Sequence, residues 1–273
     1  GRTTTFQISR GSSSPEEPTM FRTALTLFTV VSLTACGETQ NDISNEDLDD
    51  VAVVTGALIT DEGGEIQAMT DTIDTASGQP PAMLSRSGSG SWTGQRGTLD
   101  YTYDLDCFDS MGTEQSACDG TTDSAQATLS WEGLIDTQRR YAELSRSGTW
   151  TIEGLTTDSV TFSGSGRFLS DSEFQALVRP VMRSMSMDYR ATFDNVVFDR
   201  SVGYPVSGRI QFAIDAARTE ARRFRDIRAE FETTAVVEFS AEGSATIVVN
   251  GQRSYTVDMR NGEVAVDDTS TAN

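Results

Sequence analysis

Residues 99–106 read Leu-Asp-Tyr-Thr-Tyr-Asp-Leu-Asp, and residues 125–132 read Ala-Gln-Ala-Thr-Leu-Ser-Trp-Glu. In both stretches apolar and polar residues alternate one by one. A period of two places every apolar side chain on the same face of a β-strand. The alternation returns near residues 150, 160, 191, 212, 237, 247 and 257. It predicts about ten strands, each with one buried face.

The connections between these strands are short, and no long helical pattern separates them. Asn250-Gly251 lies between two strands and is a strong signal for a type I′ hairpin turn, and Asn261-Gly262 is a second pair of this kind. We therefore predict a mainly β fold. Residues 81–267 are expected to form an antiparallel meander, closed as a barrel or left as a strongly curved open sheet. Residues 268–273 are expected to be a disordered tail.

Short helices are predicted before the meander. Ser44 and Asp47 have the spacing of a capping box, and apolar residues then recur at helical intervals to about residue 60. A second short helix is predicted from about Ile66 to Gly78. We assign residues 51–80 to a short helical segment. Residues 36–50 are acidic and contain few apolar residues, so we expect a solvated tether there.

One more short helix is predicted near residues 170–179, where Ser170 and Glu173 repeat the capping-box spacing and Pro180 would end the helix. Methionines follow it closely. They are expected either to fill gaps in the core or to form an adaptable edge over an apolar cavity. The residues proposed to contact an apolar ligand are Phe174, Leu177, Val178, Met182, Met185 and Met187.

The composition excludes several kinds of chemistry. The chain has 273 residues and a formal net charge of −20, and all 21 of its basic residues are arginine, with no lysine and no histidine. A Ser-His-Asp triad, a histidine metal site, a P-loop lysine and a Schiff base are therefore impossible. The acidic charge argues against a nucleic-acid partner. No cofactor is expected.

Residues 20–36 contain one arginine, then an apolar run, then small residues before Cys36. This is the plan of an export signal, and its apolar run is too short to span a bilayer. Leu33-Thr34-Ala35-Cys36 resembles the lipobox of bacterial lipoproteins. The resemblance implies a signal peptide over residues 20–35, cleavage before Cys36 and lipid on Cys36. Residues 1–19 precede Met20 and are expected to be a misassigned upstream extension.

The other two cysteines, Cys107 and Cys118, flank a polar segment. An even pair in an exported protein favours a disulfide. The acidic residues around this segment could hold calcium, but their spacing does not match an EF-hand loop, so we expect a solvated loop and no metal site.

Together these features predict a lipid-anchored protein of the cell envelope with a non-enzymatic binding or structural role. Its partners would be the membrane, through Cys36, and an apolar ligand or an envelope protein. Two alternatives stay open. One is a lipid carrier that uses the interior of the curved sheet, and the other is a hydrolase that needs only two carboxylates. The sequence singles out no catalytic residue.

Overall fold

The computed structural model describes residues 43–60, 64–136, 140–177, 182–222, 225–241 and 243–267. Val178, Cys36 and the predicted export signal, upstream extension and disordered tail lie outside the described residues. Within them, no helix is both long enough and apolar enough to cross a membrane.

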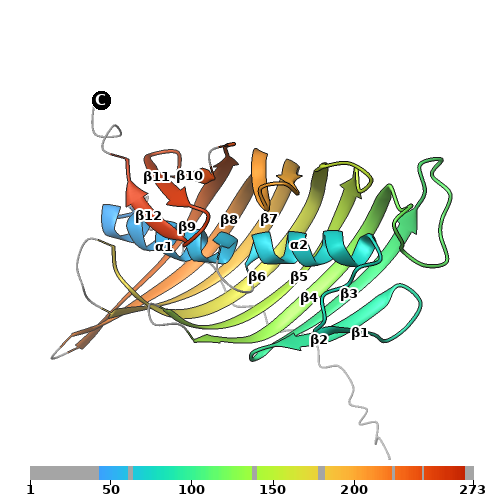
Figure 1. Cartoon of the computed structure of the whole chain (residues 1–273). Coiled ribbons are helices and arrows are strands. Elements are labelled where there is room, and N and C mark those ends of the chain that lie inside the picture. Colours follow the sequence, from blue (N-terminus) through green and yellow to red (C-terminus); the bar gives the residue numbers. More distant parts are fainter. Residues whose placement is uncertain are drawn as a thin grey trace, which may run out of the picture. The chain divides into compact units, whose positions relative to one another are not determined.

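Strands form one antiparallel sheet in which each strand pairs with the next along the chain. The long central strands sweep through a pronounced curve (Figure 1). The first and last strands are not neighbours in the sheet, so among the described residues the meander is open rather than closed into a barrel. The strands are β1 (Leu84–Arg86), β2 (Ser91–Arg96), β3 (Leu99–Phe108), β4 (Ser124–Asp136), β5 (Arg140–Glu153), β6 (Ser159–Gln175), β7 (Met182–Asp199), β8 (Tyr204–Arg222), β9 (Arg225–Phe239), β10 (Ser244–Val249), β11 (Arg253–Asp258) and β12 (Glu263–Val266).

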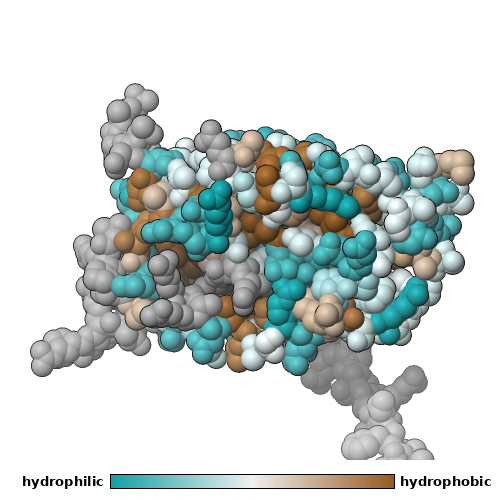
Figure 2. Space-filling view, viewed as in Figure 1, coloured by the Kyte–Doolittle hydropathy of each residue, from teal (hydrophilic) through white to brown (hydrophobic). Residues whose placement is uncertain are grey.

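Two helices cover one face of this sheet. They are α1 (Asn45–Thr60) and α2 (Glu65–Ala76), and together they form what we call the helical layer. Both lie across the inside of the curve (Figure 1). We call the covered side the inner face and the other side the outer face. On the side seen in Figure 2 the surface is mainly hydrophilic, with hydrophobic groups gathered near the upper end of β7.

Both helices confirm the sequence prediction. The Ser44 hydroxyl accepts a hydrogen bond from the Asp47 N–H at 3.2 Å, and the Asp47 carboxylate accepts one from the Ser44 N–H at 3.3 Å, which completes the capping box. The predicted tether is wrong for residues 45–50, because these residues form the first turns of α1 and three of their acids are buried. Arginines of the sheet provide the partners for those acids.

The short helix predicted near residues 170–179 is also wrong. Residues 170–175 belong to β6, where Ser170 pairs with Met187 and Phe174 with Arg183 across the ladder. The Ser170 hydroxyl lies 2.6 Å from the Ser172 hydroxyl. Pairing with β5 and β7 on both sides satisfies the backbone of this segment, and this outweighs a local capping signal.

Other local predictions are confirmed. Asn250 and Gly251 have φ angles of 53° and 63°, and positive values at both positions are what a type I′ turn requires. In the other predicted turn, Asn261-Gly262, only Gly262 has a positive φ, so this turn is not of type I′. Cys107 and Cys118 form a disulfide with their Cα atoms 5.4 Å apart.

Candidate functional site

An aromatic row crosses the inner face of the sheet. The backbone ladder places five residues side by side on neighbouring strands from β3 to β7, each directly opposite the next. In order, they are Tyr101, Trp131, Arg146, Phe168 and Tyr189. All five are buried. A single arginine therefore lies in the middle of a row of aromatic rings.

Arg146 is surrounded by these rings. Its guanidinium carbon lies 4.2 Å from the ring centroid of Trp131, 4.7 Å from that of Trp150 and 4.8 Å from that of Phe168. Each distance is within the range of a cation–π interaction, which is strongest where water is excluded. The rings therefore stabilise a cation that the interior would otherwise disfavour.

The anion that pairs with Arg146 comes from α2. Glu65 is the first residue of that helix, and its two oxygens lie 2.7 Å from Nε and 2.8 Å from Nη2 of Arg146. Both side chains are fully buried. Burial raises the pKa of Glu65 to about 7, against the attraction of Arg146. Burial also lowers the pKa of Arg146.

Three buried donors around this pair have no hydrogen-bond partner among the described residues. They are Nη1 of Arg146, Nε1 of Trp150 and the hydroxyl of Tyr103. Burial raises the pKa of the Tyr103 hydroxyl well above its usual value, and the nearby charge of Arg146 opposes this rise. Buried polar groups in folded proteins nearly always have partners. The site under α2 can therefore accept more oxygen atoms than Glu65 provides.

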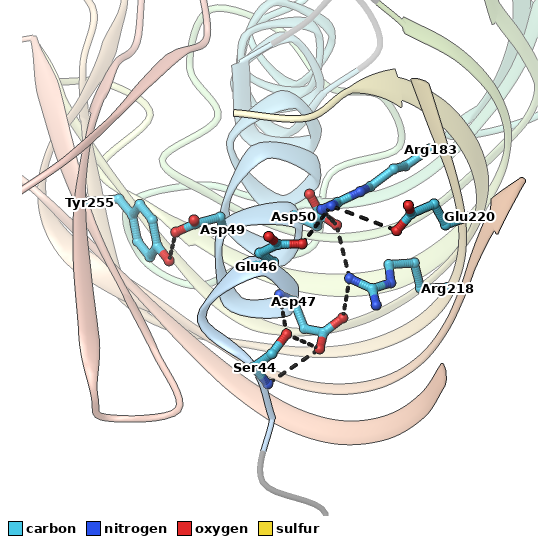
Figure 3. Close-up of polar contacts among 9 residues, drawn as sticks. All are labelled: Ser44, Glu46, Asp47, Asp49, Asp50, Arg183, Arg218, Glu220 and Tyr255. Carbon is cyan, nitrogen blue, oxygen red and sulfur yellow. Dashed lines mark hydrogen bonds and ion pairs between the residues drawn. The ribbon is translucent and has the colours of Figure 1, made fainter. Parts of the chain in front are cut away.

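A second ionic cluster attaches α1 to the sheet (Figure 3). Arg183 of β7 donates to Asp50 at 2.6 Å and to Glu46 at 2.8 Å. Arg218 of β8 lies 2.8 Å from Asp47. Burial raises the pKa of Asp50 to about 6, although Arg183 and Arg218 lower it.

The helical layer is attached at two further places. Asp49 of α1 accepts a hydrogen bond from the Tyr255 hydroxyl at 2.8 Å and lies 2.8 Å from Arg253. Asp71 of α2 lies 3.2 Å from Arg96 of β2. All the arginines in these pairs lie on the inner face.

Buried charge is thus concentrated between the two layers. Among the described residues every buried acid belongs to the helical layer, and the buried arginines, Arg146 and Arg183, belong to the sheet. The acids are Asp47, Asp49, Asp50, Glu65 and Asp71, none more than 6% exposed. Taking charges out of water is costly, and the cost is recovered when they are hydrated again. Hydration of these charges would offset part of the cost of exposing the apolar residues that the two layers also bury, such as Leu58 and Met69.

The residues predicted to contact an apolar ligand differ in burial and in position. Phe174, Met185 and Met187 are buried on the inner face, and Leu177 packs partly buried against the core. Met182 is 63% exposed at the start of β7. The structure therefore brings three of these residues together and leaves Met182 outside.

Sequence reasoning missed Arg146 and Arg183, although a signal for both exists. Arg146 lies two residues after Leu144 and four before Trp150, and Arg183 lies two before Met185. The alternation thus places each arginine on the buried face. A basic residue at such a position indicates a buried anion to pair with it.

The outer face carries a groove of about 750 Å³ over β6–β9. Asp188, Asp215 and Glu232 are directly opposite one another there. Arg167 lies 2.6 Å from Asp188 and lowers the pKa of that carboxyl, and Arg190 lies 2.9 Å from Asp215. Hydrolysis by two carboxylates needs one that stays protonated. This arrangement gives the hydrolase alternative no support.

The acids of the Cys107–Cys118 loop have local roles. The Asp109 carboxylate accepts hydrogen bonds from the N–H groups of Met111 and Thr113, and Asp119 accepts one from the N–H of Thr121. Nowhere in the described residues do three or more potential ligands gather as a metal site.

Comparison with known proteins gives no further guide. No protein family, curated protein or solved structure matches this chain.

Proposed function

We propose that this protein is a lipid-anchored component of the cell envelope that binds an apolar molecule on the inner face of its curved sheet. The helical layer covers this binding surface and moves aside to admit the ligand. The protein acts by binding and not by catalysis. The anchor is the lipid that the lipobox resemblance implies for Cys36, and the ligand replaces the helical layer over the aromatic row.

The observation that carries the proposal is the charge buried in the interface between the helical layer and the aromatic row. The inner face presents an aromatic row, and α2 packs on this face with apolar residues such as Met69 and Ile73. Two carboxylates of α2, Glu65 and Asp71, are buried in the same interface. Separation of the layers hydrates the charges but exposes the rings. An apolar ligand would cover the rings, so it would favour the open form.

Tryptophan fluorescence offers a local test, because the chain contains three tryptophans and two of them, Trp131 and Trp150, lie buried beneath α2. The probe is the methyl ester of a dibrominated stearic acid, a neutral apolar chain whose bromines quench tryptophan on contact. We expect saturable quenching of the wild-type protein. Trp92→Phe should preserve it.

The matched variant replaces Trp131 and Trp150 with phenylalanine and keeps Trp92, which lies on β2 near the sheet edge. We expect quenching to be lost in this variant. If Trp92 is quenched equally well, the probe adsorbs at the edge and the proposal is wrong. If the wild type shows no saturable quenching, the helical layer is a permanent plug and the protein has a structural role.

A further inference from the structure

The Glu65 carboxylate lies in a site that is built like a receptor for a free carboxylate. It makes a two-point contact with Nε and Nη2 of Arg146, at 2.7 and 2.8 Å. Nη2 provides the hydrogen bond of this contact, and Nε adds a second close approach of opposite charges. Arginine recognises carboxylates through several nitrogens of one guanidinium. The guanidinium itself is fixed from below by three aromatic rings. The receptor half of the pair therefore belongs entirely to the sheet and does not depend on α2.

The site also has unused capacity. Nη1 of Arg146 and Nε1 of Trp150 are buried and have no acceptor among the described residues, and the same holds for the Tyr103 hydroxyl. Glu65 is held by the first turn of α2 and approaches from one side only. A free carboxylate is not constrained in this way and could turn toward these donors.

An apolar surface continues from the site along the sheet. Phe168 lies beside Arg146 in the ladder, and its ring centroid is 6.5 Å from that of Tyr189 and 6.3 Å from that of Phe212. From β5 to β8 is three strand spacings, or about 14 Å. One leaflet of a bilayer has a hydrocarbon depth of about 15 Å. The surface therefore matches a long acyl chain in length.

We propose that the ligand is a long-chain fatty acid, and that Glu65 occupies its carboxylate site in the closed form. The fatty acid would pair with Arg146 and lie along Phe168, Tyr189 and Phe212, while α2 withdraws with Glu65. This inference rests on the proposed function, since it names the ligand class of the same surface.

The test compares two ligands that differ only in charge. Dibromostearate and its methyl ester are titrated separately at a pH of about 8, above the pKa of Glu65, and the ratio of their Kd values measures the contribution of the carboxylate. Glu65→Gln removes the competing anion and keeps its shape. We expect this variant to prefer the acid over the ester at least tenfold more strongly than the wild type does.

Two further variants assign the effect. Glu65→Gln combined with Arg146→Gln replaces the ion pair with two amides, and we expect its preference for the acid to disappear. Asp71→Asn weakens a different contact of α2, so it should strengthen binding of both ligands equally and leave their ratio unchanged. Circular dichroism and thermal melting establish that each variant is folded. If the double variant does not fold, the ratio for Glu65→Gln alone decides.

Failure of this inference can be told apart from failure of the proposed function. If both ligands bind and Glu65→Gln changes their ratio less than twofold, the inner face binds apolar chains without a carboxylate site, and only the inference is overturned. If neither ligand gives saturable quenching in any variant, the proposed function fails as well.

Discussion

At the scale of single residues, arginine has two separate roles in this protein. On the outer face, Arg167, Arg190 and Arg209 pair with aspartates of neighbouring strands at 2.6–2.9 Å, and all are well exposed. Such pairs contribute little to stability. On the inner face, Arg146 and Arg183 pair with buried acids of the helices. Loss of one partner there would leave an unpaired buried charge, which is far more costly.

The raised pKa values predict how stability depends on pH. Glu65 has a pKa of about 7 in the folded protein and 4.5 as an unperturbed group, and Asp50 has about 6 against 3.8. The folded state therefore binds more protons between these limits. Stabilisation from both groups is complete below about pH 4 and is lost as the pH rises through 6 and 7.

Urea unfolding at a series of pH values checks this prediction. We expect the free energy of unfolding to fall between about pH 4.5 and 7, by roughly 1.4 kcal/mol for each unit of pKa difference that contributes. Glu65→Gln cannot titrate, so its decline should be shallower over this range. An identical slope in the variant and the wild type would contradict the assignment to Glu65.

At the scale of elements, α1 is attached to the sheet by ion pairs and by close packing. Gly56 of α1 lies so close to β12 that a Cβ atom there would be 2.6 Å from Cγ2 of Val264. The first turns are held instead by Arg183, which contacts Asp50 and Glu46. The docking of this helix thus combines a buried apolar face, which includes Val51 and Ile59, with a buried ionic cluster.

A double-mutant cycle measures that cluster. Arg183→Leu should destabilise the protein by about 3–5 kcal/mol, because it leaves Asp50 buried without its main partner. Combining Arg183→Leu with Asp50→Leu should recover much of this loss. If the double variant is as unstable as the sum of the two single variants, the residues are not coupled.

β6 shows how tertiary contacts decide the state of an ambiguous segment. Phe174 lies on the inner face of the sheet and is only 1% exposed, whereas Leu169 of the same strand lies on the outer face and is 44% exposed. Phe174→Ala should therefore lower the free energy of unfolding by about 3–5 kcal/mol, as truncation of a core phenylalanine does. Leu169→Ala serves as the control and should cost much less. Equal effects in chemical denaturation would contradict the assigned strand faces.

At the scale of the whole molecule, the two layers should differ in stability. The sheet is joined by continuous ladders from β1 to β12, but the helical layer is joined to it chiefly by side chains. A segment that no backbone ladder joins to its neighbours can open without global unfolding. We expect amides at the centre of α2, near Met69, to exchange with deuterium faster than those at the centre of β7, near Tyr189. Equal protection would show that the layers open only together.

The sequence by itself determined the class of fold, the positions of the two helices, the Asn250-Gly251 turn and the disulfide. Each of these depends on a pattern between residues close in the chain: a period of two, a capping box, a turn dipeptide, or two cysteines around one loop. It also determined which catalytic groups are impossible, because absent residue types need no structure to be excluded.

Only the tertiary structure decided that the sheet stays open, that residues 170–175 extend β6, and that Arg146 meets Glu65. Arg146 and Glu65 are 81 positions apart in the sequence, and Arg183 and Asp50 are 133 positions apart. The periodicity placed both arginines on a buried face but could not name their partners. Which acid reaches which arginine depends on how α1 and α2 cross a curved sheet. That crossing is set by packing between distant segments, and no local pattern encodes it.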